Sequence, residues 1–309
     1  MGLGVHQGLS LTRIPTRHGV GPSRVTLPAG PWATVLDFLL ERMPDISRDE
    51  WLHRFSQGLV LNESAQPVAA TQAYTPHTQL YYYRHIANEP VLPQQARIVF
   101  EDAHLIVADK PHFMPVTPAG RYVQQSLLVQ LKHLTGLDDL VPLHRIDRET
   151  AGLVMFGKRF ADRDAYHALF RDKALHKVYE AVAAYNPSLE LPRTHTSRLQ
   201  PDTLFFRTQE VAGEPNSETR ISLLKVEDTR ALYQLEPVSG KRHQLRVHMM
   251  ALGLPLEGDQ FYPTVLRGPD AEEDFSHPLQ LLAKSVAFTD PVTGEAREFQ
   301  SALRLSITL

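Results

Sequence analysis

The chain has 309 residues, a net charge of −3 and 42% hydrophobic residues, enough for a folded core in one large or two moderate domains. It contains no cysteine, which excludes disulfides and thiolate metal sites. No stretch approaches the roughly 18 apolar residues of a membrane span, and residues 1–10 lack a secretory pattern, so we expect a cytoplasmic protein with no membrane partner.

The first third of the chain predicts an arm followed by a small helical domain. Residues 1–30 are rich in proline and glycine without a sustained period, so we expect an extended arm. Residues 35–43 keep helical spacing until Pro44, and the capping pattern of residues 47–50 begins a second helix before a short strand at 59–62. We place this domain at residues 31–92, with a boundary near Pro93.

The two short helices leading into a strand resemble the small RNA-binding module shared with a small-subunit ribosomal protein. That resemblance implies an RNA-binding role for residues 31–92. Residues 1–95 hold seven Lys or Arg and seven Asp or Glu, so a plain helical hairpin remains the alternative.

Beyond Pro93 the pattern changes to short strands. Residues 98–100 and 105–108 predict a hairpin that leads into Asp109-Lys110-Pro111. A helix is expected at 126–134, and the apolar runs 140–143 and 153–156 predict two strands.

A charged segment, His144 to Leu153, joins those two runs. Asp147 lies between Arg145 and Arg148, and nearby positive charge holds a carboxylate ionised. Asp147 is therefore a candidate nucleophile or base. The alternative is a turn residue in a surface ion pair, worth about 0–1 kcal/mol.

The remaining elements continue the alternation of strands and helices. We expect an amphipathic helix at 161–174, a strand at 177–182, a hairpin at 221–226 and 231–235, and a strand at 279–288 before a C-terminal hairpin. Between them, residues 240–249 hold His243 and His248 at a spacing of i, i+5. That spacing does not match a helical zinc motif, so no metal site is expected there.

Four of these segments resemble, in the same order, the motifs of the RluA-type RNA pseudouridine synthases. They are Glu101 to Pro111, His144 to Leu153, Lys177 to Val182 and Gly240 to Tyr262. The resemblance implies an α+β domain over residues 93–309 with a central mixed, largely antiparallel sheet. It also implies an isomerase that converts uridines of ribosomal or transfer RNA to pseudouridine by base flipping, without a cofactor.

The same resemblance assigns roles to residues. Asp147 is the expected catalytic carboxylate, Arg246 its partner, and Tyr179 the ring that lies against the target base. We expect substrate contacts from the other polar residues of these motifs, namely Lys110, His144, Arg145, Lys177, Lys241, Arg242, His243 and Gln244.

Two other functions remain open at this stage. A non-catalytic RNA-binding or ribosome-assembly protein with the same fold would bind RNA and leave uridine unchanged. A glycoside or nucleoside hydrolase would use paired carboxylates, for which Asp147, Glu149 and Asp259 are candidates. In each case we expect a monomer with no obligatory protein partner.

Overall fold

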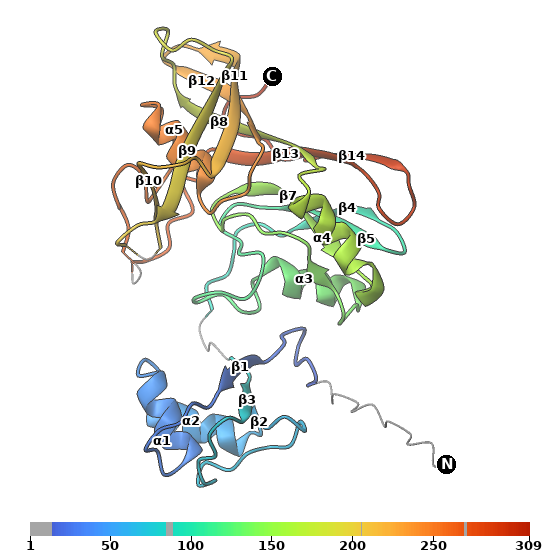
Figure 1. Cartoon of the computed structure of the whole chain (residues 1–309), viewed down its shortest axis with the longest axis vertical. Coiled ribbons are helices and arrows are strands. Elements are labelled where there is room, and N and C mark those ends of the chain that lie inside the picture. The colour runs from blue at the N-terminus through green and yellow to red at the C-terminus, as the bar shows by residue number, and fades with distance from the viewer. Residues whose placement is uncertain (1–13, 85–88, 205, 269–270) are drawn as a thin grey trace. The chain divides into compact units, whose positions relative to one another are not determined.

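The computed structural model describes residues 14–84, 89–204, 206–268 and 271–309. The chain divides into two compact units, Met1–Asn88 and Glu89–Leu309 (Figure 1). The boundary that we predicted near Pro93 lies a few residues beyond this division. Within the described ranges, no helix is long and apolar enough to cross a membrane.

The first unit is a small sheet with two helices. Its elements are β1 (Ser23–Thr26), α1 (Val35–Arg42), α2 (Arg48–Ser56), β2 (Val60–Leu61) and β3 (Gln79–Tyr82). The strands pair antiparallel in the order β1-β3-β2. The hydroxyls of Thr34 and Ser47 accept from backbone amides of the first turns of α1 and α2, which explains why the helices begin there. Both predicted helices are confirmed.

The arm predicted over residues 1–30 is too long. Residues 1–13 lie outside the described residues, whereas residues 23–26 form β1 and pair with β3. Leu27 is 1% exposed in the core of this unit. Burial of this apolar residue and the backbone pairing of β1 outweigh the proline and glycine content that suggested an arm.

The second unit is built on an 11-stranded sheet with the strand order β10-β9-β11-β12-β8-β13-β7-β5-β4, to which β14 and β6 are added at β13 and β7. All pairs are antiparallel except β13 with β7, so the predicted mixed, largely antiparallel sheet is confirmed. The strands are β4 (Arg97–Glu101), β5 (Leu105–Lys110), β6 (Val141–Pro142), β7 (Ala151–Gly157), β8 (His176–Ala184), β9 (Arg193–Pro201), β10 (Thr208–Val211), β11 (Ser217–Glu227), β12 (Arg230–Pro237), β13 (Leu281–Thr289) and β14 (Ala296–Gln300).

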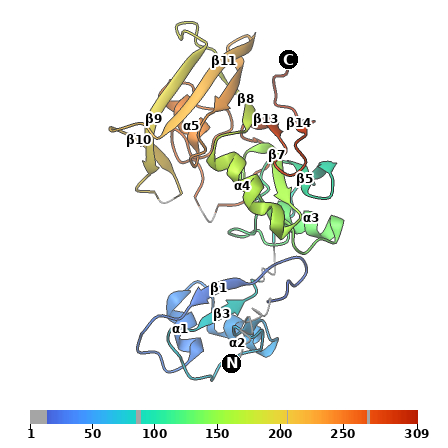
Figure 2. The same ribbon diagram turned by 45° about the vertical axis from the view of Figure 1, so that its right-hand side comes forward.

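Two helices cover opposite faces of one half of this sheet (Figure 2). Alternate residues of β7 separate the two cores: Val154 packs with α3 (Leu127–Thr135), and Met155 packs with α4 (Arg163–Arg171). A single turn of 3-10 helix, Phe160–Asp162, precedes α4. The two predicted helices of this half are confirmed.

The other half is covered by α5 (Gln244–Ala251) and by the last residues of the chain. Leu245 and Met249 of α5 pack on Ala181 and Ala183 of β8, whereas Leu305 and Ile307 pack with Val182 on the opposite face. The helix α5 was not predicted from the sequence. It presents residues 244–249 to the protein interior, so it lacks the polar face that marks an amphipathic helix.

Candidate active site

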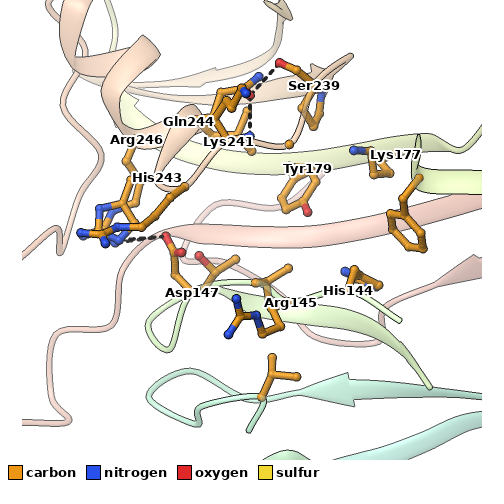
Figure 3. A pocket seen from close by; sticks show the side chains of 18 of the residues that line it. His144, Arg145, Asp147, Lys177, Tyr179, Ser239, Lys241, His243, Gln244 and Arg246 are labelled. Carbon is orange, nitrogen blue, oxygen red and sulfur yellow. Dashed lines mark hydrogen bonds and ion pairs between the residues drawn. The ribbon is translucent and has the colours of Figure 1, made fainter. Parts of the chain in front are cut away.

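A pocket of about 950 Å³ opens beside the charged segment between β6 and β7. Its walls come mainly from that segment, from residues 115–119, from α4 and β8, and from residues 237–246. Figure 3 shows the side chains from the Asp147 segment, β8 and residues 239–246. Three of the four motif segments therefore meet at one cavity. The titratable residues that line it are His144, Arg145, Asp147, Arg148, Lys173, Lys177, Tyr179, Lys241, Arg242, His243 and Arg246.

Strand register explains why Tyr179 and the Asp147 segment meet. Tyr179 of β8 lies opposite Ala283 of β13, and Ala283 lies opposite Gly152 of β7. Gly152 has φ +110°, and a Cβ there would lie 2.3 Å from the carbonyl oxygen of Ala283. Only glycine allows this close parallel pairing without strain, so Gly152 sets the distance between the loop and Tyr179.

Asp147 forms an ion pair with Arg246, as predicted. Nη1 of Arg246 donates to Oδ2 of Asp147 at 3.2 Å (Figure 3). The Asp147 side chain is 24% exposed, whereas that of Arg246 is 1% exposed. The buried Arg246 therefore binds the carboxylate from the protein interior, and the carboxylate remains accessible from the pocket.

Asp259 holds Arg246 in place. Its two oxygens accept from Nε and Nη2 of Arg246 at 2.8 and 2.7 Å, a bidentate pair that fixes the guanidinium plane. The backbone amides of Phe261 and Tyr262 also donate to Asp259. This role of Asp259 was not predicted from the sequence. The Gly258-Asp259 pair within the motif segment Gly240 to Tyr262 is the feature that could have indicated it.

Arg246 and His243 explain the charge state of Asp147. Burial by itself raises the pKa of Asp147, but positive charge on His243 and Arg246 and the hydrogen bond from Arg246 lower it by more, so the net pKa is below its usual value. The flanking arginines do not pair with this carboxylate. Arg148 instead binds Glu149 and Glu273, so our explanation from neighbouring arginines was wrong.

His243 begins α5 with a left-handed backbone, φ 55°. Its Nδ1 lies 2.8 Å from the hydroxyl of Tyr262, and its Nε2 lies 3.9 Å from Oδ2 of Asp147. Burial lowers the pKa of His243, and the negative charge of Asp147 opposes that shift. His243 supplies a polar wall next to the carboxylate.

Tyr179 lies over the pocket on β8 with Lys177 on the same strand face (Figure 3). Burial, followed by the negative charge of Asp147, raises the pKa of the Tyr179 hydroxyl. The Tyr179 hydroxyl is therefore protonated at neutral pH. Burial lowers the pKa of Lys177.

Three of the residues predicted to contact substrate bind protein groups instead. Lys110 is fully buried outside the pocket lining, and its Nζ donates to the carbonyls of Pro111 and Arg148. Gln244 donates both of its amide hydrogens to protein groups, and its side-chain oxygen accepts two hydrogen bonds from protein groups. It therefore stabilises the pocket wall and has no free donor or acceptor left to bind substrate. His144 does line the pocket, but its Nε2 accepts from the amide of Met155.

The exposed cations of the pocket are Arg145, Lys173, Lys241 and Arg242. They come from the Asp147 segment, from the residues after α4 and from the segment before α5, so they lie on different walls of the cavity. Such groups suit the phosphates on either side of an everted nucleotide. Arg145, Lys241 and Arg242 were predicted as substrate contacts, and Lys173 was not; the contacts themselves stay predictions.

Comparisons with known proteins define the family. Residues 104–251 match the family model described as RNA pseudouridylate synthase. The Vibrio cholerae dual-specificity RNA pseudouridine synthase RluA is 31% identical over 201 residues, which cover 63% of this chain and 77% of that protein. A Synechocystis protein described as an uncharacterized RNA pseudouridine synthase is 29% identical over 74% of this chain and 79% of its own. This chain belongs to the RluA-type RNA pseudouridine synthases, which are isomerases.

A solved structure supports the fold. Human RNA pseudouridylate synthase domain containing 1 aligns with a TM-score of 0.56 and 22% identity over 69% of this chain and 86% of that chain.

Human pseudouridylate synthase RPUSD2 is 31% identical over 196 residues, but this chain spans only 34% of that protein's length. The predicted family and fold class are confirmed.

Proposed function

We propose that the pocket receives one uridine everted from RNA and that Asp147 drives its isomerisation. The bond from the ribose to uracil nitrogen 1 breaks, the base rotates, and carbon 5 joins the sugar. Carbon 5 loses a proton and nitrogen 1 gains one, so no co-reactant is needed. Eversion from a base stack costs a few kcal/mol, which contacts in the pocket must offset.

One observation carries this proposal. Asp147 is the single carboxylate among the described residues that line the pocket, and a buried arginine holds it ionised beneath Tyr179. Asp147 acts on the sugar either as nucleophile or as base for the 2′ proton. Arg246 keeps the carboxylate charged and aimed, and Tyr179 stacks on the uracil, a contribution of about 1–3 kcal/mol.

The same geometry disfavours a hydrolase with paired carboxylates. Asp259 is bound on both oxygens by Arg246, and Glu149 is 7% exposed and paired with Arg148. Neither carboxylate faces the pocket, so a second acid is missing within the described lining.

The proposed substrate is ribosomal or transfer RNA. The Vibrio cholerae relative is named a dual-specificity enzyme, which supports action on more than one RNA. We further propose that residues 31–92 assist RNA binding. The cytoplasmic location and the monomeric state stay predictions.

The test uses RNA labelled with tritium at carbon 5 of uridine. Purified protein should release tritium from ribosomal or transfer RNA and leave pseudouridine at defined positions, which sequencing would map. RNA binding without tritium release would support the non-catalytic alternative. Release of free uracil would indicate a hydrolase.

A further inference from the structure

A second polar cluster lies outside the lining of the Asp147 pocket. It contains His195 of β9, Glu210 of β10 and His248 of α5. One ligand atom of each residue lies within 4.8 Å of the other two. Nε2 of His195 is 2.8 Å from Oε1 of Glu210, and Nε2 of His248 is 4.0 Å from the same oxygen.

These distances are close to those of a metal-ligand set. Tetrahedral zinc with ligand bonds of about 2.0–2.1 Å separates its ligand atoms by roughly 3.3 Å. The two measured distances fall on either side of that value. Changes of less than about 1 Å in these two distances would therefore give the ligand separation of tetrahedral zinc.

His248 has the surroundings of a metal-ligating histidine. The His248 side chain is 0% exposed, so protein groups surround both of its ring nitrogens. Nδ1 lies 2.9 Å from Oγ1 of Thr219. In the tautomer in which Nδ1–H donates to this hydroxyl, Nε2 faces Glu210 and His195 as an acceptor.

The surrounding hydroxyls allow an ion to enter. Without an ion, Nε2 of His248 lies 3.1 and 3.0 Å from the hydroxyls of Ser197 and Ser217. Hydroxyls can reorient by rotation about one bond. The side chains of His195 and Glu210 are 17% and 26% exposed, so the cluster is accessible from solvent.

We propose that His195, Glu210 and His248 form a binding site for a divalent transition-metal ion of the zinc class. Two imidazoles and one carboxylate are the ligand types that zinc accepts, with solvent in the fourth position. The ion joins β9, β10 and α5. This site is separate from the pocket lining and does not depend on the proposed function.

The test measures Co²⁺ and Zn²⁺ binding to the full chain after treatment with EDTA. We expect one Co²⁺ per chain with the visible absorption of four-coordinate cobalt, displaced by Zn²⁺. H195A and E210A should weaken binding by at least about 100-fold, more than the 10–100-fold loss that follows when only a neighbour of a ligand is removed.

His176 and Glu236 provide the matched control. They form another His–Glu pair on neighbouring strands, with Nε2 and Oε2 3.2 Å apart, but belong to no such three-residue cluster among the described residues. H176A should bind Co²⁺ like the unaltered protein. The proposal is overturned if no Co²⁺ binds at 100 µM, or if H195A binds it as well as H176A does.

Discussion

At the scale of single residues, the site combines an exposed carboxylate with a buried cation. Arg246 contacts Asp147 and Asp259 at the same time, so its charge is shared between one carboxylate that faces the pocket and one that faces the interior. Asp259 determines where the guanidinium lies. His243 and Arg246 in turn lower the pKa of Asp147 against the effect of burial.

The pH dependence of activity tests this relation. In R246K the amine cannot reproduce the bidentate pair with Asp259 and still reach Asp147, so the effect of burial dominates and the pKa of Asp147 rises. The acidic limb of the kcat profile should move to higher pH by about 1 unit or more. K241A, which changes a pocket cation outside the Asp147 ion pair, should leave that limb in place. An unmoved limb in R246K would contradict the role of Arg246.

Tyr179 gives a second prediction at this scale. Y179F keeps the ring that stacks on the base, whereas Y179A removes it. We expect Y179A to lose about 1–3 kcal/mol of stacking, measured as a 5- to 150-fold fall in kcat/KM. Y179F should lose much less. Equal losses in both variants would show that the hydroxyl, rather than the ring, matters.

At the scale of elements, the Asp147 segment is fixed by contacts from distant parts of the chain. Nη1 of Arg148 donates to Glu273 at 3.0 Å, and Arg267 binds the same carboxylate at 2.7 Å. The carbonyl of Arg148 accepts from buried Lys110. Two contacts of Arg148 therefore fix the backbone next to Asp147: the ion pair of its side chain with Glu273 and the hydrogen bond of its carbonyl with Lys110.

Loss of the Glu273 contact should change catalysis more than binding. E273Q removes the charge that orients Arg148, so we expect kcat to fall about 10-fold with little change in KM, since small misplacements of reacting groups are costly. In an R148A background, E273Q should have little further effect. E257Q, which breaks the ion pair with Arg230 outside the pocket lining, serves as control.

Gly152 offers a prediction about stability. G152A places a methyl group against the backbone of Ala283 and imposes a left-handed φ on alanine. We expect unfolding free energy to fall by at least about 2 kcal/mol, as measured by urea denaturation. G240A is the control, because a Cβ at Gly240 meets no atom within 4 Å. Equal stability of both variants would contradict the close pairing of β7 and β13.

At the scale of the whole molecule, the net charge of −3 conceals a local excess of positive charge. The lining of the pocket contains one carboxylate, that of Asp147, and the cations Arg145, Arg148, Lys173, Lys177, Lys241, Arg242 and Arg246. RNA affinity should therefore depend strongly on salt. For about four phosphate contacts, a rise from 50 to 200 mM KCl should weaken binding roughly 50-fold. Filter binding would measure this, and a flat salt profile would contradict it.

The parts of this molecule that local patterns or family motifs mark could be predicted from sequence, and the other long-range contacts could not. Short apolar runs predicted the strands around Asp147, and the family motifs predicted the Asp147–Arg246 pair. The burial of Lys110 and the saturation of Gln244 depend on groups 26 to 38 residues away or on complete chain packing. The Glu273 contact with Arg148 spans 125 residues, and no local pattern marks it.

The central claim is that Asp147 performs the chemistry, and D147N tests it most directly. The tritium-release assay on RNA labelled at carbon 5 should show no turnover, while RNA binding and the melting temperature stay close to those of the unaltered protein. D164N, which changes an exposed aspartate on α4, should retain full activity. Tritium release by D147N at the unaltered rate would contradict the account.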